Sequence, residues 1–139
     1  MSEADDSSPI EDHEYLYRRI PVGTGWFQEQ EGVVSPYAFR PTGSDSTGLS
    51  LERAIFSTPE DVAGHGRSGS SYYVVRVKAA DIRALGLDVQ PKPSPHPGHS
   101  ELPGLYYDNR RTDAAEEWQA KLADLASREP SFGPYFGGQ

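Results

Sequence analysis

Glycine and proline interrupt the whole chain, and this limits the length of any helix or strand that it can form. The sequence holds 14 glycines and 12 prolines, which together are 26 of its 139 residues. Proline cannot continue a helix or a central strand, and glycine opens turns and ends helices. The length is that of one domain. We therefore expect a single domain built from many short elements.

Local patterns assign several of these elements to strands. Residues 15–21 and 72–77 are rich in aromatic and β-branched side chains, which favour strands. The second of these runs is nearly continuous in apolar residues, which predicts a central position in the sheet. Shorter strands are expected within 33–40, 49–56 and 87–89. We expect these strands to form a twisted, mainly antiparallel sheet.

Three helices are expected beside this sheet. Thr58 followed by Pro59 is a typical helix start, because a hydroxyl cap and a proline suit these positions. A second short helix is expected over 79–85, and the longest runs from a Thr112 cap to about Arg128. The predicted class is therefore α+β, with short helices and one longer C-terminal helix. The side chains expected in its core are Trp26, Phe39, Leu51, Phe56, Val75, Val77, Ile82, Leu85, Trp118, Leu122 and Leu125.

The net charge of −8 is concentrated at the N-terminus. Six acids and no base lie in the first fourteen positions, which leaves 15 acids against 13 lysines and arginines for the rest, a net of −2. We expect residues 1–14 to be a disordered acidic leader, 15–129 to be the domain, and 130–139 to be a loose tail. Since the domain offers no concentrated basic face, nucleic acid is not an expected partner. The acids of the leader are Glu3, Asp5, Asp6, Glu11, Asp12 and Glu14.

Several classes of protein are excluded by what the sequence lacks. It has no cysteine, and therefore no disulfide, no thiolate nucleophile and no zinc site built on sulfur. No stretch approaches the roughly 20 apolar residues of a membrane-spanning helix, and the acidic start does not resemble a secretory signal. The expected location is the cytoplasm, without a membrane partner.

Three short patterns suggest a site but have simpler interpretations. Residues 64–71 resemble the opening of a phosphate-binding loop, yet Ser70 stands where such a loop needs lysine, and the segment leads from a helix into a strand. His96, His99 and Glu101 could form a metal cluster, but their proline-rich setting offers no helical face, a further ligand such as His65 or His13 would have to arrive by folding, and no metal is expected. The last three residues resemble the end of the prokaryotic ubiquitin-like protein of actinobacteria, or are simply a frayed end.

Four segments together resemble a family of small bacterial proteins for which no activity is established. The resemblance spans most of residues 15–105 and implies that the four segments belong to one folded unit. The segments are Leu16-Tyr17-Arg18-Arg19-Ile20-Pro21, Ser35-Pro36-Tyr37-Ala38-Phe39-Arg40-Pro41, Gly48-Leu49-Ser50-Leu51-Glu52-Arg53-Ala54 and Pro97-Gly98-His99-Ser100-Glu101-Leu102-Pro103.

A second resemblance is to ADP-ribosyltransferase-type domains. An arginine on an early strand, a serine on a middle strand, an aromatic residue before a short helix and a late glutamate occur here in a similar order. In those folds the arginine binds a phosphate of the nicotinamide nucleotide, the serine strand shapes the nicotinamide pocket, and the glutamate stabilises a cationic transition state. The resemblance implies NAD as a possible substrate and Ser50 and Glu101 as catalytic residues. The cofactor-binding residues that it implies are Arg18, Arg19, Phe56 and His99.

The alternative is a non-catalytic protein that binds a partner, of the immunity, antitoxin or adaptor type. Eight tyrosines and two tryptophans supply the aromatic anchors that interfaces favour, and the acidic leader could steer a basic partner. In both cases the expected partner is another protein. The enzyme hypothesis requires Arg19, Ser50 and Glu101 to face one cleft, whereas recognition becomes the default if they point to separate sides.

Overall fold

The computed structural model describes residues 6–139, and within them the elements are as follows. The strands are β1 (Tyr15–Pro21), β2 (Phe27–Gln28), β3 (Val33–Val34), β4 (Leu49–Arg53), β5 (Ser71–Lys78), β6 (Gln90–Pro91), β7 (His99–Leu102) and β8 (Phe132–Phe136). The helices are α1 (Pro59–Gly64), α2 (Ala79–Ala84) and α3 (Asp113–Ser127), with the 3₁₀ turns η1 (Pro36–Phe39) and η2 (Tyr107–Asn109).

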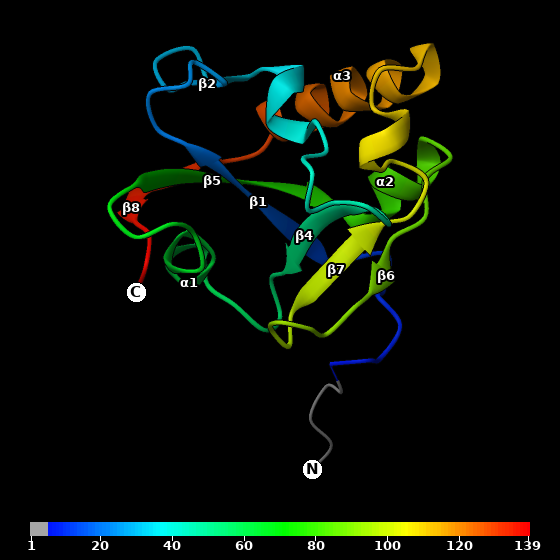
Figure 1. Cartoon of the computed structure of the whole chain (residues 1–139), viewed down its shortest axis with the longest axis horizontal. Coiled ribbons are helices and arrows are strands. Elements are labelled where there is room, and N and C mark those ends of the chain that lie inside the picture. The colour runs from blue at the N-terminus through cyan, green and yellow to red at the C-terminus, as the bar shows by residue number, and fades with distance from the viewer. Residues whose placement is uncertain (1–5) are drawn as a thin grey trace.

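Six strands form one antiparallel sheet with the order β6-β7-β4-β1-β5-β8, and β2 pairs with β3 outside it. Helices α2 and α3 lie together along one side of this sheet, whereas α1 lies by itself on the other side (Figure 1). The predicted α+β class, with one longer C-terminal helix, is confirmed. Strand β5 has a neighbour on each side, but β4 and β1 are the two middle strands.

Side chains of β1 alternate between the two faces of the sheet, as the pleat of a strand requires. Leu16 and Ile20 are fully buried in the main core, which α2, α3 and η1 cover. Tyr17 points to the opposite face, where it packs with Val62 of α1 and Val74 of β5. The sheet therefore has a large apolar core on one face and a small one on the other.

The long helix begins at the predicted cap, where Thr112 accepts a hydrogen bond from the Ala115 amide. Of the eleven expected core residues, six are fully buried and the other five are partly buried. The fully buried ones are Phe39, Leu51, Val75, Val77, Ile82 and Leu122. The partly buried ones are Trp26, Phe56, Leu85, Trp118 and Leu125.

Two of the expected strands are wrong in extent. The strand expected over 33–40 stops at Val34, because Ser35 caps the following 3₁₀ turn and Pro36 occupies its first position. The strand expected over 87–89 forms instead at β6, while Leu87 and Val89 are buried in the main core. In both places a capping residue or burial outweighs the local strand preference.

The packed unit extends beyond the predicted boundaries of 15 and 129 on both sides. Residues 1–5 of the expected leader lie outside the described residues, but Ile10 and Glu14 are buried against the domain. Ile10 joins the main core, and Glu14 forms a buried ion pair with Arg53 at 2.9 Å. At the other end the expected loose tail supplies β8, which pairs with β5. Apolar burial and this ion pair hold the N-terminal segment, and strand pairing holds the C-terminal one, although composition alone assigns both to flexible ends.

In the described part of the chain, residues 6–139, no helix is both long and apolar enough to cross a membrane.

Candidate functional site

The sheet opens between its two middle strands. Strands β1 and β4 pair Leu16 with Arg53 and Tyr17 with Glu52, whereas β1 stays paired with β5 along its whole length. Beyond Tyr17 the Arg18 side chain reaches across the opening and donates to the carbonyl oxygen of Ser50 at 2.9 Å. The divergence of the two strands makes a fork in the sheet, and the fork forms the base of a pocket.

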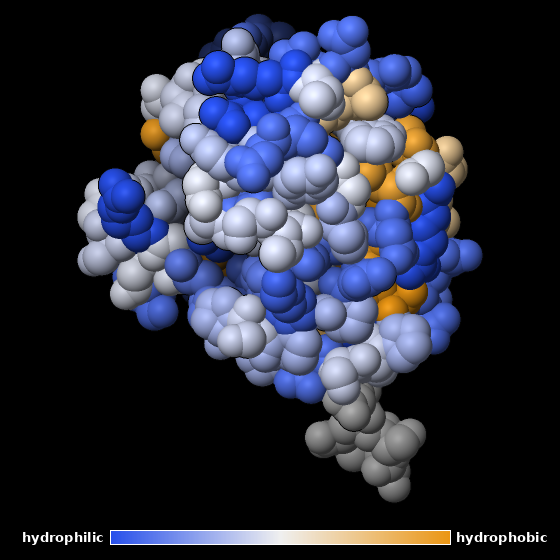
Figure 2. Space-filling view, turned by 45° about the vertical axis from the view of Figure 1, so that its right-hand side comes forward, coloured by the Kyte–Doolittle hydropathy of each residue, from blue (hydrophilic) through white to orange (hydrophobic). Residues whose placement is uncertain are grey.

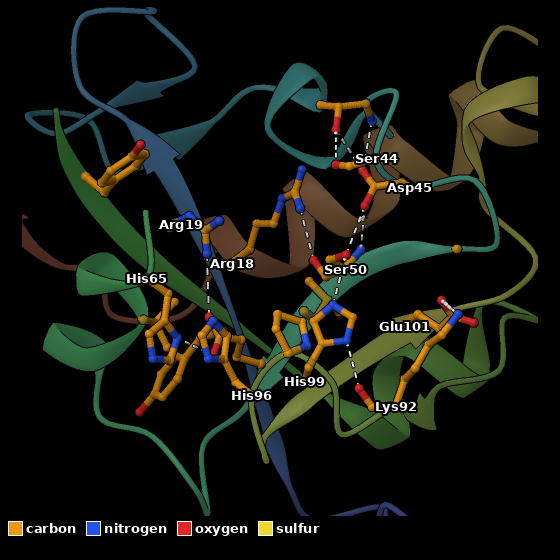
Figure 3. A pocket seen from close by; sticks show the side chains of 18 of the residues that line it. Arg18, Arg19, Ser44, Asp45, Ser50, His65, Lys92, His96, His99 and Glu101 are labelled. Carbon is orange, nitrogen blue, oxygen red and sulfur yellow. Dashed lines mark hydrogen bonds and ion pairs between the residues drawn. The ribbon is translucent and has the colours of Figure 1, made fainter. Parts of the chain in front are cut away.

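This pocket has a volume of about 680 Å³ and is built from distant parts of the sequence. Its walls come from β1, β4, β7, the loop 41–48, the loop 92–98 and the C-terminal end of α1. Most of its polar side chains point toward one another in the close view (Figure 3). A volume of this size is within the range of small-molecule and cofactor sites.

Five of the six predicted site residues line this one pocket. Arg18 and Arg19 come from β1, Ser50 from β4, and His99 and Glu101 from β7. Ser50 and Glu101 are direct neighbours across the β4–β7 ladder, so their side chains leave the same face of the sheet. The fold thus brings together residues that are far apart in the sequence, since Glu101 lies 83 positions after Arg18.

Phe56 does not line the pocket, which is a correction to its predicted role. Strand β4 ends at Arg53, and the chain then turns away from the fork. The Phe56 ring lies 5.1 Å from the Arg53 guanidinium, and the Cβ of Phe56 lies beside Gly98. Phe56 therefore supports the base of the loop 92–98.

Arg18 occupies the fork itself. Its Nε donates to the carbonyl oxygen of Ala38 at 2.8 Å and its Nη1 to that of Ser50 at 2.9 Å. Burial lowers the pKa of Arg18 to about 10, while the nearby Asp45 carboxylate opposes this shift. The guanidinium therefore stays charged at neutral pH and replaces hydrogen bonds that a continuous β1–β4 ladder would make.

Ser50 lies between an acid and an imidazole. Its Oγ is 2.9 Å from Oδ1 of Asp45 and 3.1 Å from Nε2 of His99. Asp45 is buried, and its other carboxylate oxygen accepts from the Thr42 amide at 2.8 Å. The other ring nitrogen of His99 lies 2.9 Å from the carbonyl oxygen of Lys92. Figure 3 shows this chain of contacts along one wall.

Glu101 closes the pocket next to Ser50. Its Oε2 accepts from Oγ1 of Thr47 at 2.9 Å and pairs with Nζ of Lys92 at 3.2 Å. The Lys92 ammonium also donates to Thr47 at 2.8 Å. This triangle holds the Glu101 carboxylate at the rim, with the Lys92 side chain half-exposed.

A second acid, Glu52, lies two residues after Ser50 on β4 and close to the end of α1. Its side chain is 6% exposed, and it pairs with Nδ1 of His65 at 2.8 Å and with Nη1 of Arg19 at 3.5 Å. The His65 ring stacks on the His96 ring, with centroids 3.6 Å apart and planes 10° apart. Burial and the neighbouring His65 lower the pKa of His96. The two rings join α1 to the loop 92–98.

The metal cluster suggested by His96, His99 and Glu101 does not form. Each of the three side chains has its own partner, which is His65, Ser50 and Lys92 respectively. Within residues 6–139 no group of three histidine, aspartate or glutamate side chains is placed to hold a metal ion. The loop 64–71, which resembles a phosphate-binding loop in sequence, connects α1 to β5.

Sequence reasoning missed Asp45, Glu52 and the pairing of His65 with His96. Glu52 had a usable signal, because it lies two residues after Ser50 on a strand and so shares its face. Asp45 lies in a loop of small polar residues, where no periodicity marks it. The contact of His65 with His96 depends on tertiary packing alone.

No family model, no curated protein and no solved structure matches this chain. The candidate site is therefore interpreted from its own geometry. The pocket combines two guanidinium groups, one ammonium group and three imidazoles with three carboxylates and several hydroxyls. Such a set suits a ligand that carries both anionic groups and sugar hydroxyls.

Proposed function

We propose that this protein is an enzyme of the ADP-ribosyltransferase type that uses NAD, by ADP-ribosyl transfer or by NAD glycohydrolysis, in the cytoplasm. The observation that supports it is the meeting of Arg19, Ser50 and Glu101, from three different strands, in one pocket. The resemblance assigns the arginine to binding of the nucleotide, the serine to the shape of the pocket and the glutamate to catalysis. An arrangement on separate sides of the molecule would have favoured recognition instead.

The geometry distinguishes between the two candidate arginines. The guanidinium of Arg18 is engaged with two carbonyl oxygens inside the fork. The Arg19 side chain is 39% exposed, and its ion pair with Glu52 is long at 3.5 Å. Arg19 can therefore turn to a diphosphate and bind it through two nitrogens. In this proposal Arg18 holds the fork open and Arg19 binds the nucleotide.

Glu101 is the proposed catalytic residue. Loss of nicotinamide from NAD develops positive charge on the ribose carbon, and a fixed carboxylate stabilises that charge. Thr47 and Lys92 hold the Glu101 carboxylate in place from one side. Ser50, its cross-strand neighbour, would border the nicotinamide ring. Water or an acceptor hydroxyl then attacks the ribose carbon.

The test is binding and turnover of NAD by the wild-type protein and two variants. We expect millimolar NAD to raise the melting temperature, since a ligand that binds only the folded state stabilises it. We expect Glu101→Gln to keep the fold and this shift but to lose nicotinamide release, measured by chromatography. Glu31→Gln, which changes an exposed acid, is the matched control. Absence of a thermal shift at millimolar NAD would contradict the proposal.

A second candidate function is binding of a protein partner without catalysis. Phe136 is 76% exposed, and Tyr37 and Ile55 are 55% and 50% exposed. Figure 2 shows hydrophobic residues that reach the surface along one side of a largely hydrophilic face. If this is the function, a pull-down returns one stoichiometric partner that Phe136→Ser weakens and that Glu101→Gln retains. A pull-down with Glu101→Gln that returns nothing counts against it.

A further inference from the structure

The hydrogen bonds around His99 fix which ring nitrogen carries a proton. Its Nδ1 lies 2.9 Å from the carbonyl oxygen of Lys92, and a carbonyl can only accept, so Nδ1 bears hydrogen. The Lys92 amide in turn donates to the carbonyl oxygen of His99 at 2.9 Å. This second hydrogen bond holds the Lys92 carbonyl beside the His99 ring. In the neutral ring, Nε2 is therefore an acceptor, and it faces Ser50.

The Ser50 hydroxyl has one proton and two neighbours that can accept it. Its Oγ lies 3.1 Å from Nε2 of His99 and 2.9 Å from Oδ1 of Asp45. When the His99 ring is neutral, the Ser50 hydroxyl donates to one neighbour, and no hydrogen remains for a bond to the other neighbour. With a proton on Nε2, the ring donates to Ser50 and Ser50 donates to Asp45, and every contact is a hydrogen bond. The three side chains Asp45, Ser50 and His99 can therefore take up one added proton.

Asp45 is fixed as an acceptor of the hydrogen bond from the Ser50 hydroxyl. Its Oδ2 accepts from the Thr42 amide at 2.8 Å, and its Oδ1 lies 3.3 Å from the Ser50 amide. The residue is 4% exposed, and its own carbonyl oxygen accepts from the Tyr107 amide at 3.0 Å. The carboxylate therefore stays oriented toward Ser50 whichever way the hydroxyl points.

We propose that Asp45, Ser50 and His99 form a proton relay that takes up the proton released when an acceptor hydroxyl is ADP-ribosylated. This inference rests on the proposed function. The bond between the ribose carbon and the nicotinamide nitrogen breaks, and its electrons leave with neutral nicotinamide. The acceptor oxygen bonds to the same carbon and gives its proton to Ser50 Oγ, as the Ser50 proton moves to Nε2 of His99. The reaction releases one proton, and the relay accepts one.

The other charged groups around the relay are engaged elsewhere. Arg18 is held by its two carbonyl oxygens, and Glu52 by Arg19 and His65. The Glu101 carboxylate, on the strand beside Ser50, is held by Thr47 and Lys92, and His96 stacks on His65. Of these groups, Arg18, Arg19 and Lys92 are cations, and Glu52 and Glu101 are acids. The Ser50 hydroxyl therefore contacts two basic groups, the Asp45 carboxylate, which accepts its hydrogen bond, and the His99 ring, which takes up the proton in the proposed step.

The first test is the tautomer of His99, which needs no activity. We expect ¹⁵N spectra of histidine-labelled protein at high pH to show the neutral ring of His99 with hydrogen on Nδ1. His13 is exposed and serves as an internal reference for an ordinary ring. Ser50→Ala should change the Nε2 signal of His99 and leave that of His13 unchanged. A neutral His99 with hydrogen on Nε2, or an Nε2 signal that ignores Ser50→Ala, overturns the relay.

The second test is the pH dependence of nicotinamide release. Loss of a general base typically costs about 10²-fold or more in rate, so we expect His99→Asn to slow turnover about 10²-fold. It should also weaken the loss of rate at low pH that protonation of a general base produces. Ser50→Ala combined with His99→Asn should be little worse than either change alone, since a relay acts as a unit. His13→Asn is the control.

The two tests separate this inference from the function on which it rests. If the wild-type protein releases nicotinamide and His99→Asn keeps the rate and the pH profile, the relay is refuted and the function stands. If the wild-type protein releases none, the proposed function fails and the transfer step fails with it. The ¹⁵N spectra then still decide whether His99 and Ser50 share a proton.

Discussion

At the scale of single residues, two adjacent arginines have different tasks because a strand points them to different places. Arg18 lies in the fork and bonds to Ala38 and Ser50, whereas Arg19 lies over the Tyr72 ring at 5.8 Å and pairs with Glu52. A planar guanidinium can bridge two carbonyl oxygens at fixed angles, which a lysine ammonium cannot reproduce. The two positions therefore respond differently to the same substitution.

We expect Arg18→Lys to destabilise the fold by about 1–2 kcal/mol, because one carbonyl oxygen at the fork loses its donor. Urea denaturation measures this change. Arg19→Lys keeps its charge in a partly exposed position and is the matched control, with little expected effect on stability. Equal midpoints for the two variants would show that Arg18 does not hold the fork.

At the scale of elements, the loop 92–98 is attached to α1 through the stacked rings of His65 and His96. Burial, and then His65, lower the pKa of His96 in the folded protein relative to an unfolded chain. A group of this kind contributes stability above its unfolded pKa, about 6.5 for histidine, and loses it as the pH falls below that value. The attachment of the loop is thus sensitive to acid.

We expect the melting temperature of the wild-type protein to fall more steeply between pH 7 and pH 5 than that of His96→Gln. The unfolded wild-type chain takes up a proton on His96 in this window, whereas the variant has no such group. Thermal melts across this range check the difference, with His13→Gln as an exposed control. Parallel curves for all three proteins would contradict the role of His96.

The elements themselves were predictable where a local signal decides them. The helices that begin after Thr58 and Thr112 were found from their caps, since capping depends on neighbouring residues only. Strand β7 was missed, because His99–Leu102 has no strand-like composition and is fixed by pairing with β4. Of the site, Arg19, Ser50 and Glu101 came from a resemblance in order, whereas Asp45 and His65 depend on long-range packing.

At the scale of the whole molecule, both ends of the described chain are tied to the domain. Arg53 is fully buried and bonds to Glu14 and to the carbonyl oxygen of Ser8 at 2.9 Å each. The terminal residues run beside α1, where the Gly138 amide donates to the carbonyl oxygen of Gly64 at 2.9 Å. Composition marked both ends as flexible, because it cannot register an ion pair or a docked strand.

We expect Glu14→Ala to destabilise the fold by about 3–5 kcal/mol, because the Arg53 charge is left buried without its partner. Urea denaturation measures the loss. Glu117→Ala removes an exposed partner of Lys121 and is the matched control, with no measurable change expected. A midpoint for Glu14→Ala equal to that of the control would show that the ion pair does not anchor residues 6–14.

We expect Gly137→Ala to destabilise the fold by about 1–3 kcal/mol, since the added methyl group overlaps the carbonyl oxygen of Arg67. Gly43→Ala adds the same group where no atom lies within 4 Å and is the control. Limited proteolysis should then cleave the tail of the Gly137 variant faster. Cleavage at the same rate in both variants would show that the tail is not closely packed.

Because the pocket lies over the fork between β1 and β4, its width is set by the backbone and not by side chains. The diverging strands are held by their outer neighbours, β5 and β7, so exchanging a side chain at the rim alters the chemistry of the pocket and leaves the sheet in place. The rim is supplied largely by two loops, 41–48 and 92–98, which tolerate change better than strands do. A scaffold of this kind can acquire a new ligand by replacing loops while its sheet persists.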